Sequence, residues 1–181
     1  AYVTSNPYSR MVLENDYPTD NEGNVRAHRR VKKYSVASPV PSDELHTFLD
    51  LSNSSEDYGS VKIPSPRSVT NHVIELDRGE DSPPRVIAHY MPPHRPYIAR
   101  LVNGEIEFTD KPRSGSSFDA YIDNLRWALN EVSLLLENVD RERVVISADH
   151  GENFRLRPIL QDHHPGMITP AVRRVPWVQT T

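Results

Sequence analysis

A carboxylate and an imidazole stand side by side at Asp149 and His150, directly before Gly151. They follow residues 144–146, a Val-Val-Ile run that predicts a buried parallel strand, since it is too short and too β-branched for a helix. Open α/β sheets bind ligands at the carboxyl ends of their strands. An oxygen donor and an imidazole held there suit a divalent cation, and Gly151 leaves room for a turn and a ligand. The alternative interpretation is a strand end capped by the Asp149 side chain, with His150 partly solvated.

A second polar cluster follows the strand expected at 85–91, where prolines flank His94 and Arg95. Because the prolines present His94 stiffly, we predict that it donates to an oxyanion, with Arg95 beside it. A plain surface histidine is the alternative. His89 lies inside the strand, and we expect it to be a hydrogen-bonded core residue.

A third polar cluster, Asp162-His163-His164-Pro165-Gly166, places His164 fourteen residues after His150. A loop histidine at that distance is able to fold back and complete a metal shell. The alternative is that these residues form only a turn.

The composition limits the class of protein. A chain of 181 residues is long enough for one domain with a core, or for a piece of a larger one. Only 36% of the residues are hydrophobic and 16 are prolines, which predicts much loop. The net charge of −4 argues against nonspecific nucleic-acid binding. The absence of cysteine excludes disulfides, thiolate metal sites and cysteine nucleophiles within these residues.

No targeting segment is recognisable. No apolar run approaches the roughly 20 residues needed to cross a bilayer, so we expect no membrane span. The chain begins at Ala1 with neither an initiator methionine nor a signal peptide, which indicates processing or excision from a longer protein. The lack of cysteine leaves the compartment open, and we expect a cytoplasmic protein because neither a signal peptide nor a span is present.

The elements that would position these clusters are more regular in the second half. For the first half we predict a strand at 1–3 and an edge strand at 31–36. We also predict a short helix at 43–51 after Ser42, a loop at 52–66 and a weak helix at 67–77 closed by Gly79. For the second half we predict a buried strand at 85–91, a hairpin at 101–109 and a long helix capped through Ser116 and Asp119. That helix has apolar residues at helical spacing: Phe118, Tyr121, Ile122, Leu125, Leu129, Val132, Leu135, Leu136 and Val139.

The strand at 85–91, this helix and the strand at 143–148 predict a βαβ unit with parallel pairing. Such a unit brings the carboxyl ends of both strands to the same edge of the sheet. We therefore expect His94 and the Asp149-His150 pair to share one rim.

Several segments also carry family features: Tyr-Ile-Asp-Asn-Leu-Arg at 121–126, the run 134–140, Val-Val-Ile-Ser-Ala-Asp-His-Gly-Glu at 144–152 and Pro-Ala-Val-Arg-Arg-Val-Pro-Trp-Val at 170–178. Together they resemble sulfatase-like proteins of halophilic archaea, in the alkaline phosphatase superfamily. The resemblance covers residues 85–181 well and 3–7 more faintly. It implies an α/β fold with a mainly parallel sheet and flanking helices, the C-terminal part of an alkaline phosphatase-like fold. The whole of 1–181 would be one domain, incomplete at its N-terminus, with a loop-rich part at 1–84 and a core at 85–181.

The resemblance also implies a chemistry: metal-dependent hydrolysis of sulfate or phosphate esters, of small molecules or of glycans. Asp149 and His150 would bind a divalent ion such as Ca, Mn or Zn, and His164, before Pro165, would join the metal shell. His94 would contact the sulfate or phosphate group. These residue types suit the roles, since a metal polarises the ester oxygen and imidazole stabilises charge on the transferred group.

The sequence departs from the family pattern where the nucleophile should be. The N-terminal half of the family supplies an acidic metal ligand and a nucleophile, and this chain has neither cysteine nor a Ser-x-Pro-x-Arg signature. After Glu152 the sequence is bulky and basic, where the family has small residues. Two hypotheses follow: a hydrolase active only with an N-terminal half absent from these residues, or a non-catalytic binding or assembly module. Group transfer onto cell-surface polymers is a third.

Overall fold

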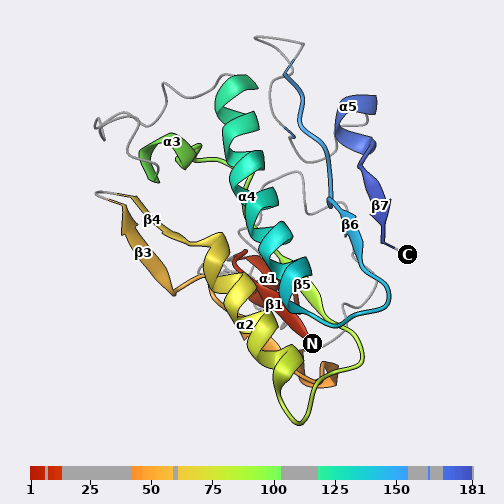
Figure 1. The fold of residues 1–181 in the computed structure, drawn as a ribbon. Coiled ribbons are helices and arrows are strands. Elements are labelled where there is room, and N and C mark those ends of the chain that lie inside the picture. The colour runs from red at the N-terminus through yellow and green to blue at the C-terminus, as the bar shows by residue number, and fades with distance from the viewer. Residues whose placement is uncertain are drawn as a thin grey trace, which may run out of the picture. The chain divides into compact units, whose positions relative to one another are not determined.

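The structure is a computed structural model that describes residues 1–6, 8–13, 42–58, 61–102, 118–154, 163 and 169–180. It is a mixed α/β structure with a small parallel sheet packed against helices and separate antiparallel strand pairs (Figure 1). The chain divides into two compact units. Unit 1 comprises Ala1–Asp16 and Ser38–Asp140, and unit 2 comprises Tyr17–Ala37 and Arg141–Thr181.

A three-stranded parallel sheet lies at the centre of unit 1. Strand β1 (Tyr2–Thr4) is the middle strand, between β2 (Phe48–Asp50) and β5 (Ile87–His89). Val3 is opposite Leu49 on one side and Ala88 on the other, and its side chain is fully buried. The structure confirms the strand expected at 1–3. It shortens the one expected at 85–91, in which Ile87 is exposed rather than buried.

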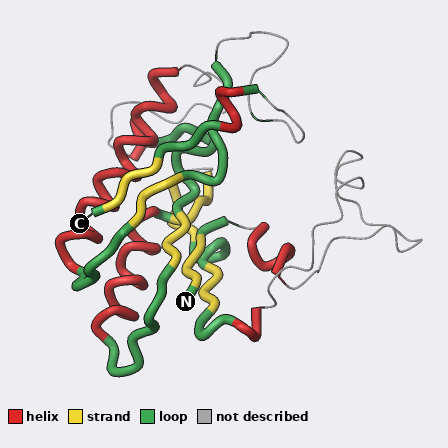
Figure 2. The backbone as a smooth tube through the Cα atoms, turned by 90° about the vertical axis from the view of Figure 1, so that its right-hand side faces the viewer, coloured by secondary structure: helices red, strands yellow, loops and turns green. Residues whose placement is uncertain are grey.

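Two long helices cover this sheet, and Figure 2 shows both on one side of its strands. Helix α2 (Pro66–Arg78) begins where the hydroxyl of Ser65 accepts a hydrogen bond from the Arg67 backbone N–H, at 3.2 Å, and it ends at Gly79. Helix α4 (Phe118–Asn138) forms where the apolar spacing predicted a helix. Its buried residues are Asn124, Ala128, Glu131 and Leu135, of which only Leu135 belongs to the predicted apolar set, and Phe118 and Leu129 of that set are exposed. The core is made of buried residues from both helices and the sheet: Val3, Leu51, Val69, Val73 and Leu135. Both predicted helices are confirmed.

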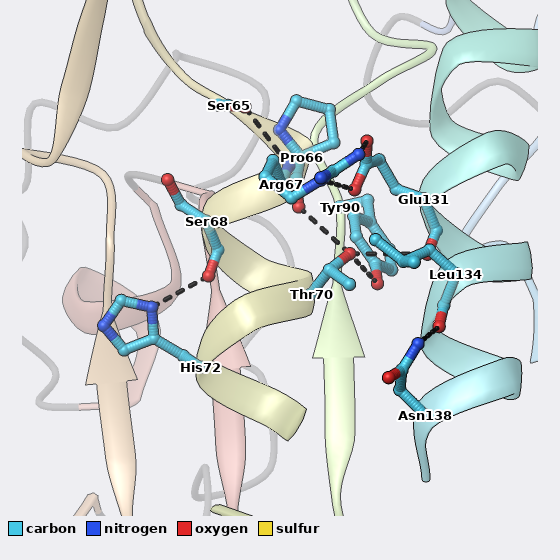
Figure 3. Close-up of polar contacts among 10 residues, drawn as sticks. All are labelled: Ser65, Pro66, Arg67, Ser68, Thr70, His72, Tyr90, Glu131, Leu134 and Asn138. Atoms are coloured by element: carbon cyan, nitrogen blue, oxygen red, sulfur yellow. Dashed lines mark hydrogen bonds and ion pairs between the residues drawn. The ribbon is translucent and has the colours of Figure 1, made fainter. Parts of the chain in front are cut away.

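Polar contacts join α2 to α4 above this core (Figure 3). The Arg67 guanidinium donates from Nε and Nη2 to the two carboxylate oxygens of Glu131, at 2.6 and 2.9 Å. One turn further along α2, the Thr70 hydroxyl lies 3.0 Å from the Tyr90 hydroxyl, just beyond β5. Burial raises the pKa of Tyr90, the hydrogen bond with Thr70 opposes that rise, and the nearby Glu131 carboxylate adds to it. These contacts fix the two helices and the end of β5 to one another.

The segment between β1 and α2 differs from the prediction. Instead of a helix at 43–51, only a 3-10 turn, η2 (Ser42–Glu44), forms before β2. Pairing of β2 with β1 outweighs a weak helical tendency, because an edge position in the sheet satisfies the backbone and buries Leu51. The predicted loop at 52–66 instead contains an antiparallel hairpin, β3 (Ser55–Tyr58) and β4 (Val61–Pro64).

The short helices α1 (Tyr8–Leu13) and α3 (Ala99–Val102) complete unit 1. A hairpin was expected at 101–109. Its first two residues belong to helix α3, and residues 103–109 lie outside the described residues. The edge strand predicted at 31–36 and the cap at Ser116 also lie outside them.

Unit 2 contains β6 (Val145–Ser147), α5 (Pro170–Arg173) and β7 (Trp177–Gln179). The structure corrects the prediction of a buried parallel strand at 144–146. Strand β6 pairs antiparallel with β7, and Val145 is exposed. In this pair Val145 and Val178 are exposed, whereas Ile146 is half-buried.

The predicted βαβ unit is also corrected as far as the described strands go, since β5 has β1 as its parallel neighbour and β6 has β7. Whether the ends of β5 and β6 share a rim stays a prediction, because each unit is described by itself. None of the helices in the described ranges has the length and apolarity that a bilayer crossing requires.

Removal of Arg67 tests the contact between α2 and α4. The Glu131 side chain is only 7% exposed, whereas that of Arg67 is 54% exposed. Arg67→Met therefore leaves a buried carboxylate without its partner, and we expect a loss of about 2 kcal/mol in unfolding free energy, below the value for a fully buried pair. The exposed Arg126, which pairs with Asp123 on α4, is the matched control; Arg126→Met should cost less than about 0.5 kcal/mol. Equal losses in urea unfolding would contradict this account.

Candidate functional site

The predicted carboxylate and imidazole follow β6 in a tight turn. The Asp149 Oδ1 atom accepts a hydrogen bond from the His150 backbone N–H at 3.0 Å. The second oxygen, Oδ2, lies 3.7 Å from His150 Nε2, so the two side chains face one another. Both side chains are open to solvent, Asp149 more than His150. A strand end capped by Asp149 and a pair of cation ligands are therefore compatible with the same geometry.

A neighbouring carbonyl determines which nitrogen of His150 carries the proton. Nδ1 lies 3.0 Å from the Gly151 carbonyl oxygen, which only accepts hydrogen bonds. Nδ1 is therefore the donor, and Nε2 of the neutral ring has the lone pair that a metal binds. Two ligands of one ion at about 2.0–2.3 Å lie about 3.3–3.8 Å apart at bond angles near 110°. The distance between His150 Nε2 and Asp149 Oδ2 falls in this range, so the two donors fit one cation.

A second histidine lies against His150. The ring of His163 is 4.1 Å from that of His150, centroid to centroid, with 30° between their planes. Its Nδ1 lies 2.7 Å from the Glu152 carboxylate, whose side chain is nearly buried. The Glu152–His163 pair thus supports one face of the imidazole that the proposed metal would use.

Among the residues that the structure describes, no set of three or more His, Asp or Glu side chains is arranged to hold a metal ion. Asp149 Oδ2 and His150 Nε2 are two potential donor atoms that face one another. The predicted third ligand, His164, lies outside the described residues. Sequence reasoning missed Glu152 and His163 as neighbours of His150. The signal for Glu152 was its place on the same turn; nothing in the spacing identified His163.

Gly151 is the residue at which the turn after β6 contacts α5. Its backbone N–H donates to the Val172 carbonyl at 2.8 Å. A Cβ at this position would lie 2.1 Å from the Ala171 carbonyl oxygen and 3.0 Å from that of Arg174. The sequence suggested that glycine leaves room for a turn and a ligand; the structure shows that it is α5 that needs the room.

The predicted substrate residue, His94, belongs to unit 1. It lies in the loop between β5 and α3, and the peptide bonds Pro92-Pro93 and Arg95-Pro96 are cis. Its backbone N–H donates to the Met91 carbonyl at 2.9 Å, and its Nδ1 donates to the Arg95 carbonyl at 2.6 Å. The side chain is exposed, which suits both a contact with an oxyanion and a plain surface histidine. Asp149 belongs to unit 2, and a rim shared by His94 and Asp149 stays a prediction.

A further group of polar side chains, around His89, lies at the carboxyl end of the sheet in unit 1. His89 Nδ1 lies 2.7 Å from the Tyr2 hydroxyl and 3.3 Å from that of Thr4. The Ser9 hydroxyl lies 3.1 Å from both of these hydroxyls. The predicted hydrogen bonding of His89 is confirmed, but the residue is half-buried rather than part of the core. Its hydroxyl partners carried no recognisable signal in the sequence.

Asp50 ends β2 beside this cluster. Its Oδ2 accepts a hydrogen bond from Arg10 Nε at 3.1 Å, and its Oδ1 accepts one from the Ser52 backbone N–H at 3.0 Å. Burial alone would raise the pKa of Asp50, but the hydrogen bonds from Ser52 and the ion pair with Arg10 together outweigh it. The pKa is therefore held below its ordinary value of 3.8, and Asp50 remains a carboxylate paired with Arg10.

Comparisons with protein-family models, with curated proteins and with solved structures found no match to this chain. The interpretation of Asp149, His150 and His94 therefore rests on their chemistry and geometry.

Substitution of Gly151 tests how the turn is held. We expect Gly151→Ala to displace α5 from the turn, because the added methyl group meets backbone atoms that have no flexible end to move. The cost should be about 2 kcal/mol or more in unit 2. Gly79 is the matched control: a Cβ there meets carbonyl oxygens at 3.5 and 3.6 Å, an ordinary contact. Hydrogen exchange at the Gly151 amide, or at the corresponding amide of the variant, measures the effect. Full protection in Gly151→Ala would rule out the close approach of α5.

Proposed function

We propose that this chain supplies metal ligands and an anion contact to a metal-dependent hydrolase of sulfate or phosphate esters. The observation that carries the proposal is the turn after β6. There Nε2 of His150, the nitrogen that has the lone pair when the neutral ring donates from Nδ1, lies 3.7 Å from a carboxylate oxygen of Asp149. Mixed imidazole and carboxylate ligands suit Zn or Mn, and a carboxylate also suits Ca.

Each residue has a definite part in this proposal. A bound divalent ion would polarise the ester oxygen and lower the pKa of an attacking hydroxyl or water. Asp149 would bind the ion through Oδ2 and His150 through Nε2, with the Gly151 carbonyl keeping the proton on Nδ1. The tilted ring of His163, packed against that of His150, would limit its rotation. His164 is proposed as a third ligand.

His94 would hold the anionic end of the substrate. Because its Nδ1 already donates to the Arg95 carbonyl, a second hydrogen bond, from Nε2, requires the doubly protonated ring. That ring carries a positive charge, which favours sulfate or phosphate oxygens. The Arg95 guanidinium lies over the Tyr97 ring at 5.7 Å and keeps a further positive charge on the same loop.

A non-catalytic assembly module is the second candidate, favoured by the surface of the β6–β7 pair. Trp177 is 70% exposed, and Val145, whose register places it on the same face of the strand pair, is exposed as well. An exposed apolar group of this kind is typical of a surface that binds another protein. Turnover of aryl sulfate and aryl phosphate esters by the full-length gene product separates the two candidates, because an assembly module has no turnover that His94→Ala can abolish.

Calorimetric titration with Zn²⁺, Mn²⁺ and Ca²⁺ tests the metal ligands directly. The double variant Asp149→Ala, His150→Ala should bind at least one of these ions about tenfold or more weakly than the unmodified chain, because both donors are removed. The matched control is His46→Ala, Asp81→Ala, which removes another exposed histidine–carboxylate pair, 3.3 Å apart in unit 1. Its binding heats should equal those of the unmodified chain. Equal heats for all three proteins would exclude the site.

A further inference from the structure

One side chain of α4 contacts both the middle of the loop that carries His94 and the start of α3, where the loop ends. The Oδ1 atom of Asn124 accepts a hydrogen bond from the Ala99 backbone N–H at 2.9 Å, at the start of α3. Its Nδ2 donates to the carbonyls of Pro96 and His94, at 3.2 and 3.5 Å. Asn124 is 1% exposed, so these contacts are made away from water.

The chemistry of these partners requires an amide at this position. An N–H group needs an acceptor and two carbonyls need donors, and only a side chain with both kinds of atom serves them together. A carboxylate at position 124 would accept from Ala99 but would meet the carbonyls of His94 and Pro96 with negative charge. An alanine would leave buried backbone groups unpaired, which costs more than the hydrogen bonds themselves contribute.

Neighbouring residues of α4 hold the same segment. The Tyr121 ring packs edge-on against the Tyr97 ring, at 6.2 Å between centroids and 87° between planes. Asp123 pairs with Arg100 of α3 at 2.5 Å. Residues 98 and 99 are buried, whereas His94 itself is exposed. The loop is thus anchored at its base and presents its imidazole at the surface.

We propose that Asn124 is the positioning residue of His94: it fixes the loop backbone so that the imidazole is presented in one orientation to a tetrahedral oxyanion. The identity of the ligand rests on the proposed function, whereas the anchoring stands on the contacts alone. Asn124 touches no substrate in this proposal and acts through the backbone of residues 94–99.

The test compares Asn124→Asp with Asn130→Asp, an exposed position on the same helix. Three quantities are followed by NMR: hydrogen exchange at the Ala99 amide, the ring signals of His94, and their response to inorganic sulfate. In Asn124→Asp we expect the Ala99 amide to exchange about 100-fold faster. The chemical shifts of the His94 ring should move toward an average over several ring orientations. Half-saturation of the His94 response should require about a tenfold higher sulfate concentration. Asn130→Asp should match the unmodified chain in all three.

The outcomes separate the anchoring from the proposed function. If Asn124→Asp keeps the exchange rate of Ala99 and the His94 signals, the proposal is overturned. It is also overturned if Ala99 loses protection while the sulfate response at His94 is unchanged. If sulfate does not move the His94 signals of the unmodified chain, the proposed function is contradicted, and the anchoring is then judged by the first two quantities.

A measurement on the unmodified chain covers the case in which Asn124→Asp does not fold. The side-chain amide protons of Asn124 should exchange at least about 100-fold more slowly than those of Asn130, because they are buried and bonded to carbonyls. Equal exchange rates for the two side chains would overturn the proposal.

Discussion

Helix α4 buries two polar side chains, and the arrangement of unit 1 depends on both being matched. Its buried residues are Asn124, Ala128, Glu131 and Leu135, which recur on one face of the helix. Asn124 meets the loop after β5, and Glu131, two turns along, meets Arg67 of α2. A shift of α4 by one turn would leave a carboxylate and an amide buried without partners. Hydrophobic contacts hold α4 against the core. The polar contacts determine its position along its own axis relative to α2 and the loop after β5.

A series of contacts runs from the core residues of α2 to the exposed loop that carries His94. Val69 and Val73 of α2 pack in the core with Val3, while Arg67 at the start of the same helix holds Glu131. Thr70 carries the connection to Tyr90, just beyond β5, and the His94 loop follows. The loop is therefore held from both sides, by the end of the strand that precedes it and by the helix on which it rests. Rigid presentation of His94 is a consequence of this packing.

The sequence was sufficient to predict the two long helices, α2 and α4. Helix α4 followed from its apolar spacing, and α2 from its apolar spacing and the glycine at its end. Strand β2 was wrongly predicted as a helix, because pairing with β1 is a tertiary contact with no local signature. Strand β6 was predicted as a strand but not with its antiparallel partner, since a β-branched run suits either kind of pairing. The roles of Asn124 and Glu131 could not be predicted, because the apolar pattern of α4 does not mark the face that carries them and gives no sign of their partners.

The two residues of the candidate metal site could be predicted from the sequence, but the contacts that surround them could not. The Asp-His-Gly order identified two donors, and their side chains do face one another. The shape of the turn depends on α5 approaching Gly151 from 20 residues later in the chain, and the support of His150 depends on His163. The proposed third ligand, His164, is the neighbour of that histidine in the sequence. Contacts made across such separations are set by the folded chain, so sequence order does not reveal them.

The protonation state of His150 tests this account most directly. Long-range ¹H–¹⁵N NMR spectra of the neutral imidazole distinguish a proton on Nδ1 from one on Nε2. We predict a protonated Nδ1, bound to the Gly151 carbonyl, and an Nε2 resonance that moves when Zn²⁺ is added. A proton on Nε2, or an Nε2 resonance that Zn²⁺ leaves unchanged, would contradict the assignment of Asp149 and His150 as metal ligands.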